Sequence, residues 1–225
     1  MGYTLVYTQV LEFFPYLVRG ALISLQIAIL AFFGGMFFGL IFATIRTFGN
    51  RLMNNLVICY VTFFTNTPQL VQIYFLFFAL PEVGILLSPF MAVLIGMTLN
   101  AAAYLCEIQR AGFLSIRQNE LDAAKTLNFT LIQQVKYVIL PHIMKVLFPP
   151  LSNHYIIMTL GTSMAAIFGV EELTGRALNI NSETFRSIEV FSLTALIYIV
   201  ITFIATFLLA LIGRYFFKAK MRIIQ

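Results

Sequence analysis

The sequence predicts an all-α membrane protein with five transmembrane helices. Hydrophobic residues make up 60% of the 225 positions and charged residues only 10%, which is too little charge for the surface of a soluble domain. Five apolar runs are also long enough to cross a bilayer, which takes about 20 residues of helix. These runs cover residues 21–45, 52–80, 83–106, about 134–160, and 190–213.

The net charge of +5 is explained by orientation in a membrane rather than by binding to nucleic acid. The basic residues lie in short segments between the apolar runs and form no dense cluster. Most of them fall on the side that holds the C-terminal tail, and this side is expected to be the cytoplasm. Because five spans place the termini on opposite sides, the N-terminus is expected outside and the C-terminus inside.

Three segments are expected along the chain. Residues 1–19 mix aromatic and polar side chains and are predicted to form a periplasmic or interfacial segment. They lack the pattern of a secretory signal, so the first span is expected to remain in the mature protein. Residues 20–214 form the predicted membrane domain, and residues 215–225 a basic cytoplasmic tail.

The first and third spans each carry a feature suited to helix contacts. In the first, Gly34, Gly35 and Gly39 would allow another helix to approach closely. At the end of the third, Glu107 and Arg110 lie three residues apart, so they are predicted to form an ion pair on one helical face. This pair is interpreted as structural, with a direct role in transport as the alternative.

Polar side chains and a proline interrupt the second span near its middle: Asn66, Thr67, Pro68, Gln69 and Gln72. A membrane helix keeps such residues only where protein or a wet cavity satisfies the freed backbone groups. Two interpretations remain open, that these residues line a transport path or that they form hydrogen bonds between helices.

The fourth span contains Pro141, Pro149 and Pro150, so it is predicted to kink, and kinked helices in transporters tend to border the route. Residues 161–189 hold charged side chains among Gly, Asn, Ser and Thr. They are predicted to form a folded external loop with one short helix.

A short amphipathic helix is predicted at about residues 119–128. Asn119 would cap its start, and Glu120 and Asp122 suit the positive end of the helix dipole. Asn128 would close it in the left-handed conformation. At roughly 14 Å, the helix is too short to cross a bilayer. An apolar stripe is formed at helical spacing by Leu121, Ala124, Leu127 and Leu131.

This helix carries a resemblance to a known family. The order Asp122, Ala123, Ala124, then Asn128, then residues 138–141 (Val-Ile-Leu-Pro) resembles the Glu-Ala-Ala...Gly...Ile-x-Leu-Pro motif in permease subunits of ATP-binding-cassette (ABC) importers. More narrowly, the chain resembles the polar amino-acid branch, of histidine and glutamine type, over about residues 20–214. The segments that carry the narrower resemblance are 67–72, 104–110, 140–153, 162–173 and 184–189.

The sequence departs from the family pattern in two ways. Asp122 replaces the Glu of the motif and keeps a carboxylate on a shorter arm. Asn66, Asn119 and Asn128 stand where the family usually has Gly. Because Asn tolerates positive φ better than other residues with a side chain, the same backbone turns are expected at all three positions.

The resemblance implies a type I importer permease (MetI-like) fold whose short helix is the cytoplasmic coupling helix. It also implies two permease subunits, identical or homologous, with two ATPase subunits and an external substrate-binding protein, in the bacterial inner membrane. The substrate class implied is a polar L-amino acid, moved by alternating access. The residues expected to contact the ATPase are Glu120, Leu121, Asp122, Ala123, Ala124, Leu127 and Asn128.

No enzymatic activity is expected of this chain. It has no Gly-x-x-x-x-Gly-Lys-Ser/Thr phosphate loop, no His-Glu-x-x-His and no Gly-x-Ser-x-Gly. His142 and His154 have no metal-ligand spacing around them, and Cys59 and Cys106 are interpreted as packing residues. ATP and magnesium are therefore expected on the separate ATPase subunit, with no cofactor or metal bound here.

A substrate path is predicted around the fourth span and the break in the second. Hydroxyl and amide groups satisfy the carboxylate and ammonium of an amino acid without fixed charge. His154 falls where relatives resembling cationic amino-acid carriers often have Glu, which disfavours a strongly cationic substrate; the alternative is that His154 merely bonds a neighbouring helix. The path residues are Thr67, Gln69, Asn153, His154, Met158, Thr162 and Ser163.

Two other classes of protein would show different sequence features. A secondary carrier would be expected to show internal repeats and ionisable residues within the membrane, whereas Glu107 lies at the end of a span. A non-transporting assembly subunit would need neither a proline-broken polar span nor an amphipathic helix between spans. Copurification with an ATPase would separate all three classes.

Overall fold

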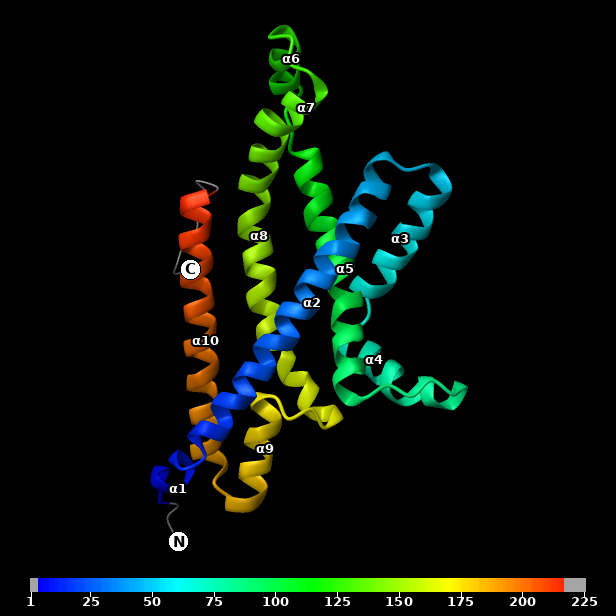
Figure 1. Ribbon diagram of the computed structural model, residues 1–225. Coiled ribbons are helices and arrows are strands. Elements are labelled where there is room, and N and C mark those ends of the chain that lie inside the picture. The colour runs from blue at the N-terminus through cyan, green and yellow to red at the C-terminus, as the bar shows by residue number, and fades with distance from the viewer. Residues whose placement is uncertain (1–3, 217–225) are drawn as a thin grey trace. The chain divides into compact units, whose positions relative to one another are not determined.

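The computed structural model describes residues 4–216, which form helices joined by turns and contain no strand (Figure 1). The long helices are α2 (Phe14–Phe48), α5 (Pro89–Leu114), α8 (Leu140–Gly161) and α10 (Ser187–Phe216). The shorter ones are α1 (Tyr7–Leu11), α3 (Arg51–Thr65), α4 (Gln69–Tyr74), α6 (Gln118–Thr126), α7 (Leu131–Gln134) and α9 (Leu173–Thr184). Turns of π-helix lie at Phe75–Ala79 and Val135–Ile139, and turns of 3-10 helix at Leu80–Val83 and Thr162–Phe168.

The predicted fold class, an all-helical membrane protein, is confirmed. Within the described residues, α2, α5 and α10 are each long and apolar enough to cross a membrane. Two bent pairs of helical segments also qualify, Arg51–Thr65 with Gln69–Val83 at 103° and Leu131–Phe168 with Leu173–Thr184 at 47°. Counting each pair as one span gives up to five spans, in agreement with the predicted number.

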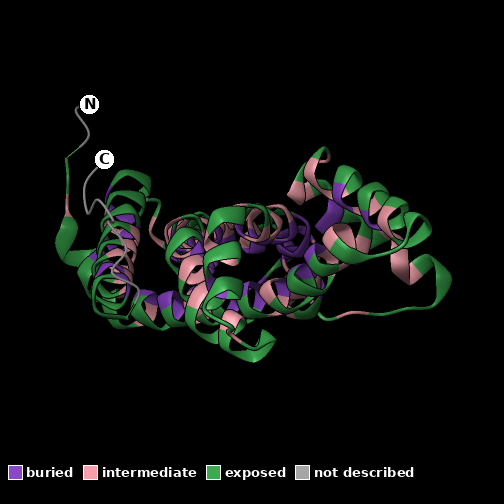
Figure 2. Ribbon diagram, turned by 90° about the horizontal axis from the view of Figure 1, so that it is seen from above, coloured by how far each residue is buried: buried purple, intermediate pink, exposed green. Residues whose placement is uncertain are grey.

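The surface of these helices is largely apolar. Figure 2 shows that exposed positions predominate along the ribbons, and many of these carry Leu, Ile or Phe. In the most apolar stretch of α10 only 11% of the residues are buried, against 56% in α5. A helix with apolar side chains exposed on most sides is suited to lipid rather than to water.

The ends of several spans differ from those predicted. Helix α2 begins at Phe14, so residues 14–20 belong to the first span and only α1 represents a separate N-terminal helix. The uncharged run starts after Arg19, but a charged side chain near a helix end does not terminate the helix. At the other end, α10 extends through Phe216, and Lys218, Lys220 and Arg222 lie outside the described residues.

The third span starts later than predicted. Residues 83–88 are not part of α5, because Gly84 has φ +84° and turns the chain. Ser88 then caps the helix, since its Oγ accepts a hydrogen bond of 3.3 Å from the backbone N–H of Met91. Pro89 occupies the first helical position, where its missing N–H costs nothing.

The prolines of the fourth span do not end it. Pro149 and Pro150 lie inside α8, which continues to Gly161. Pro141 is the second residue of α8, which follows the π-helical turn Val135–Ile139. A proline removes one backbone hydrogen bond and crowds the preceding carbonyl, and a π-helical turn is one of the ways in which a helix absorbs that change.

The chain divides into two compact units. The first comprises residues 4–33, 67–99 and 155–205 of the described chain. Its apolar core joins α1, α2, α9 and α10 through residues such as Leu17, Leu173 and Val190. Beside this core Glu172 is fully buried, and its carboxylate accepts hydrogen bonds from Ser24 Oγ at 2.8 Å and Tyr198 OH at 2.9 Å.

The second unit comprises residues 34–66, 100–154 and 206–216. Its core joins α2, α3 and α5 through buried Ala43, Val57, Val61, Ala103 and Cys106. Here the backbones of α2 and α5 lie very close together. A Cβ on Gly35 would meet Ala101 Cβ at 2.5 Å, and one on Gly39 would meet the Cys106 backbone nitrogen at 3.0 Å. Close packing is thereby confirmed for two of the three glycines predicted to allow it.

Candidate functional site

The short amphipathic helix exists as α6, in the segment that joins α5 to α8 within the second unit (Figure 1). It starts one residue earlier than predicted, with Arg117 as the capping residue and no side-chain cap. The prediction that Asn119 caps the helix is wrong, because Asn119 lies within the first turn. Glu120 occupies this turn as predicted, and Lys125 lies in the last turn, so both charges suit the helix dipole. The same prediction is wrong for Asp122, which lies beyond the first turn because the helix begins at Gln118.

The end of α6 matches the prediction for Asn128, which has φ +56°. The N–H of Asn128 donates to Lys125 O at 2.9 Å, and the N–H of Phe129 donates to Ala124 O at 3.0 Å. These two bonds form a Schellman motif, a common way to satisfy the last carbonyls of a helix. The corresponding expectation is wrong for Asn66, which has φ −104°, and for Asn119, which is helical.

A second start signal follows at once. Thr130 and Gln133 form a capping box, in which Gln133 N–H donates to Thr130 Oγ1 and Thr130 N–H donates to Gln133 Oε1. Leu131 therefore begins α7. The prediction that it belongs to the apolar stripe of α6 is wrong. The period of 3.6 residues carried no sign of the break, because the turn depends on Asn128 and Thr130.

Burial divides the predicted contact residues of α6. Ala124 is only 3% exposed, so it packs within this chain, and Leu121 is half-buried. Asp122 and Ala123 are exposed, and Leu127 is 68% exposed. Ile132 was not among the predicted contact residues, yet it is 77% exposed beside an equally exposed Leu131. We call Leu127, Leu131 and Ile132 the apolar tip.

The predicted ion pair between Glu107 and Arg110 is confirmed, with Arg110 Nε 3.5 Å from Glu107 Oε2. The structure adds a third residue to this pair that was not predicted. Arg46 of α2 donates a hydrogen bond from Nη1 to Glu107 Oε1. Arg46 is 61 positions away in the chain, so no local spacing could reveal it. One carboxylate thus bridges two guanidinium groups.

Side chains of α5 form hydrogen bonds to backbone carbonyls just before the break in the second span, within the second unit. Asn100 Nδ2 donates to Phe64 O at 3.1 Å, and Tyr104 OH donates to Thr65 O at 3.3 Å. Helix α5 thereby satisfies carbonyls at the end of α3. The polar residues of the break itself form local bonds, because Asn66 Nδ2 donates to Thr62 O of its own helix and Gln72 Nε2 donates to Thr67 Oγ1, so both interpretations of these residues stay predictions.

Five of the predicted path residues lie in the first unit. Thr67 is half-buried and accepts a hydrogen bond from Gln72 Nε2 at 2.7 Å. Gln69 Oε1 lies beside the end of α8, 3.9 Å from the position of a Cβ on Gly161. Met158 and Thr162 are buried, and the hydroxyls of Thr162 and Ser163 donate to carbonyls of their own helical segment.

The other two path residues lie in the second unit, one exposed and one half-buried. Asn153 is exposed. The ring of His154 lies 5.7 Å from that of Tyr104, centroid to centroid. Its Nε2 is buried, and no residue of the described chain provides it with a hydrogen bond. An unpaired buried polar atom costs about 1–3 kcal/mol, so this nitrogen is a candidate for contact with a ligand.

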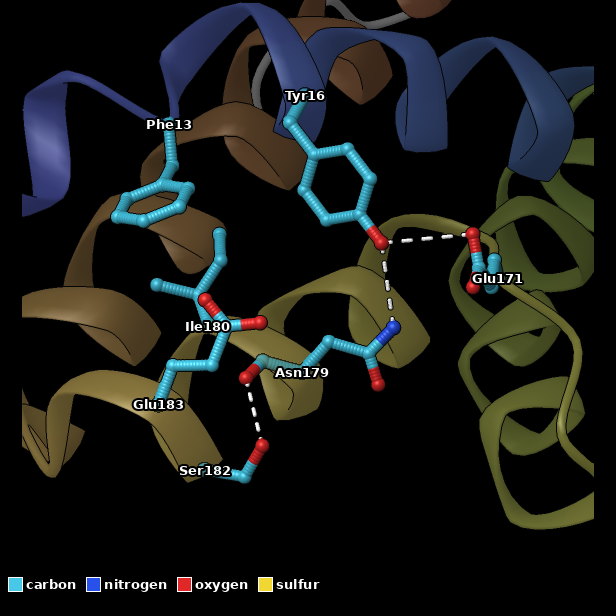
Figure 3. A pocket seen from close by; sticks show the side chains of 7 residues that line it. All are labelled: Phe13, Tyr16, Glu171, Asn179, Ile180, Ser182 and Glu183. Atoms are coloured by element: carbon cyan, nitrogen blue, oxygen red, sulfur yellow. Dashed lines mark hydrogen bonds between the residues drawn. The ribbon is translucent and has the colours of Figure 1, made fainter.

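A separate pocket of about 590 Å³ lies in the first unit (Figure 3). Tyr16 OH donates to Glu171 Oε2 at 3.4 Å and accepts from Asn179 Nδ2 at 3.2 Å. None of the predicted path residues lines this pocket. Among residues 4–216, no group of three His, Cys, Asp or Glu side chains could hold a metal ion. The lining residues are Phe13, Tyr16, Glu171, Asn179, Ile180, Ser182 and Glu183.

An all-helical chain with up to five spans and a short amphipathic helix between two of them has the architecture expected of the membrane subunit of a transport system. A family model described as "Binding-protein-dependent transport system inner membrane component" matches residues 35–218. The chain belongs to this family.

Two relatives illustrate the sequence similarity. The chain is 34% identical over 202 residues to the glutamine transport system permease protein GlnP of Escherichia coli K12, covering 89% of this chain and 92% of the relative. It is also 34% identical over 204 residues to the L-cystine transport system permease protein TcyB of Bacillus subtilis strain 168, covering 90% and 87%.

The fold is similar to that of solved transporters. A crystal structure of an amino acid ABC transporter with histidines superposes with a TM-score of 0.87 at 28% identity, covering 94% of this chain and 99% of the other. A chain of the inward-facing MetNI methionine ABC transporter superposes with a TM-score of 0.69 at 19% identity, covering 88% and 94%, which shows the fold alone.

The family membership establishes the general role of the chain. It is a permease subunit of a binding-protein-dependent ABC importer, a multi-pass protein of the inner membrane. It works in a complex with an ATPase and a binding protein, and ATP hydrolysis resides in the separate ATPase subunit. The alternatives of a secondary carrier and of a non-transporting assembly subunit are thereby set aside.

Proposed function

We propose that this permease carries a polar L-amino acid and that α6 is its coupling helix. Relatives are described as transporting glutamine, L-cystine and octopine, all of them polar and related to amino acids. The breadth of these substrates supports a class rather than one compound. The external binding protein would deliver the substrate, and closure of the ATPase subunits would switch the permease between its two orientations.

The observation that carries the coupling role is the apolar tip. Leu127, Leu131 and Ile132 are between 68% and 77% exposed at the end of a hairpin that leaves the membrane-spanning helices. Burying one such side chain is worth about 1.5–3 kcal/mol, so a partner surface that covers all three would gain considerably. Asp122 and Lys125 lie on α6, with Lys125 Nζ 3.7 Å from Asp122 Oδ1, and would supply polar contacts at the rim.

Substitution of two neighbouring alanines tests this role. Ala123 is exposed and Ala124 is buried, so Ala123→Arg should leave the permease folded but block docking, whereas Ala124→Arg should disturb its own hairpin. We expect the Ala123→Arg permease to insert normally and to lose its ATPase on purification. Ile132→Asp should also cause loss of the ATPase. If the Ala123→Arg and the Ile132→Asp permeases each form a fully coupled, transporting complex, the proposal is refuted.

For the substrate path, the supporting observation is the buried and unpaired Nε2 of His154. A polar substrate could supply the missing hydrogen bond, with the Tyr104 ring alongside. Gln69 and Thr67, at the start of the helical segment after the break in the second span, are proposed to face the same route. Asn153, Met158, Thr162 and Ser163 complete the proposed path.

The path is tested in a reconstituted complex with its binding protein. ATP hydrolysis and uptake are measured across a panel of amino acids, for the wild type and for His154→Ala and Thr67→Val. Both variants should alter substrate-stimulated hydrolysis without loss of assembly. Leu160→Ala, at an exposed apolar position near the end of α8, is the control. Wild-type profiles for both variants would move the path elsewhere.

The proposal includes the arrangement of the complex. Two permease subunits, identical or sister chains, would dock two ATPase subunits, with the N-terminus outside and the C-terminus in the cytoplasm of a bacterial cell. The apolar surface of α10, of which little is buried, leaves room for lipid and for a second permease. Native mass spectrometry of the purified complex would count the subunits.

A further inference from the structure

In the second unit, His142 at the start of α8 contacts both the end of α5 and the first turn of α6. These three segments form the base of the hairpin that carries α6 and α7, which we call the coupling hairpin. Its Nε2 is 3.1 Å from Ser115 O and 3.2 Å from Ser115 Oγ, at the end of α5. Its Nδ1 is 3.5 Å from Glu120 Oε2, in the first turn of α6. His142 itself belongs to the start of α8, 27 positions from Ser115.

We propose that His142 is a positioning residue for coupling, which holds α6 at a defined orientation to the ends of α5 and α8. This inference rests on the proposed coupling role of α6. The segments 115–117 and 127–130 that join α6 to its neighbours are not α-helical. A side-chain bridge across the base therefore adds a direct connection from α6 to α8, besides the backbone.

The hydrogen-bond roles at Nε2 follow from its partners. A backbone carbonyl only accepts, so Nε2 must carry a hydrogen to bond Ser115 O. Ser115 Oγ donates its own hydrogen to Gly112 O at 2.7 Å, so toward His142 it too presents lone pairs. Both contacts at Nε2 thus call for a donor on the imidazole.

At Nδ1 the partner is the Glu120 carboxylate, which also accepts only. Both ring nitrogens therefore face acceptors on neighbouring segments. His142 thus connects the start of α8 to the first turn of α6, through Glu120, and to the end of α5, through Ser115.

Through this bridge the side chain of His142 connects α6 to two spans, α5 and α8. Glu120 lies three residues before the exposed Ala123, on the same short helix that ends at the apolar tip. A force on the tip would pass through the Glu120 contact to α8 and through the Ser115 contacts to α5. Loss of the bridge should let α6 tilt while the ATPase remains bound, so hydrolysis would continue with less transport.

The test measures substrate transported per ATP hydrolysed in the reconstituted complex. His142→Ala should lower this ratio by about threefold or more. In His142→Asn the amide occupies the place of Nδ1 and keeps the Glu120 contact, and in His142→Gln it occupies the place of Nε2 and keeps the Ser115 contacts. Each should recover part of the ratio. Lys145→Ala, at an exposed position three residues further on, is the matched control.

A double-substitution cycle isolates the bridge itself. Glu120→Gln should lower the ratio in the wild type and add little in the His142→Ala background, because both changes remove one interaction. Additive losses, or a wild-type ratio in all His142 variants, would overturn the inference. If Ala123→Arg also leaves transport coupled, the role of α6 has failed; if only the His142 variants are silent, the positioning role alone has failed.

Discussion

At Asn128 one side chain decides where α6 ends. A left-handed backbone costs an ordinary residue roughly 1–2 kcal/mol, and Asn bears this cost better than most. Glu107 decides a second local arrangement, because it lies between two guanidinium groups, those of Arg46 and Arg110. Position 128 requires a residue that accepts a positive φ, and position 107 requires a negative charge, so substitutions at each can test one requirement at a time.

Replacement of Asn128 should reveal the positive φ. Asn128→Gly is expected to change the stability of the hairpin by less than about 0.5 kcal/mol, since Gly accepts the same turn. Asn128→Val should destabilise it by about 1–3 kcal/mol, because a β-branched residue resists this conformation. Hydrogen exchange of the amides of residues 124–134 measures the difference. Equal protection in the two variants would contradict the argument.

Replacement at the ion cluster should be asymmetric. Glu107→Gln removes the only carboxylate that the structure places between Arg46 and Arg110, so two cations are left close together. Arg110→Gln instead removes one of the two like charges and keeps the pair with Arg46. We expect Glu107→Gln to lower the melting temperature of the purified permease by several degrees and Arg110→Gln by less. The reverse order would show that the cluster is not held by Glu107.

Among the helices, the contact between α2 and α5 depends on glycine. Gly35 and Gly39 lie one helical turn apart, and α5 approaches them with its backbone and with small side chains. In lipid there is little hydrophobic gain from helix association, so close contact of this kind supplies much of the attraction. The glycines of α2 thus position the helix that also carries Glu107.

Larger residues at this contact should separate the two helices. Gly39→Leu is expected to cost at least about 1–3 kcal/mol, because the neighbouring atoms are backbone atoms that cannot move aside. The loss is measured as a lower midpoint of unfolding in detergent. Leu40→Ala, at the next and exposed position, is the control and should change the midpoint little. Equal midpoints for both variants would contradict the close packing.

For the molecule as a whole, the proposed orientation in the membrane follows from the distribution of basic residues. Most Lys and Arg residues lie on the side of α6 and of the C-terminal tail, which favours the cytoplasm for both. The proposed functions depend on this orientation, since the ATPase can reach α6 only from the cytoplasm. The orientation can be measured without the rest of the complex.

Cysteine labelling tests the orientation in cells. In a background with Cys59→Ala and Cys106→Ala, a cysteine in place of exposed Ser182 should react with an impermeant reagent in intact cells. A cysteine in place of exposed Asn119 should react only after permeabilisation. The opposite pattern would reverse the topology and exclude docking of an ATPase on α6.

The sequence was sufficient for features that depend on near neighbours in the chain. The apolar runs, the short helix and its end at Asn128, and the pairing of Glu107 with Arg110 all follow from helical spacing and backbone preference. Even here the helix starts were misjudged at Phe14 and Pro89, because charge marks the edge of an apolar run and not the edge of a helix.

Features that join distant parts of the chain could not be predicted in this way. Arg46 reaches Glu107, His142 reaches Ser115 and Glu120, and Ala124 is buried while Ile132 is exposed. Each of these depends on which helix faces become buried when the spans pack together. Packing depends on the sum of many weak contacts between remote segments, and spacing along the chain carries no information about that sum.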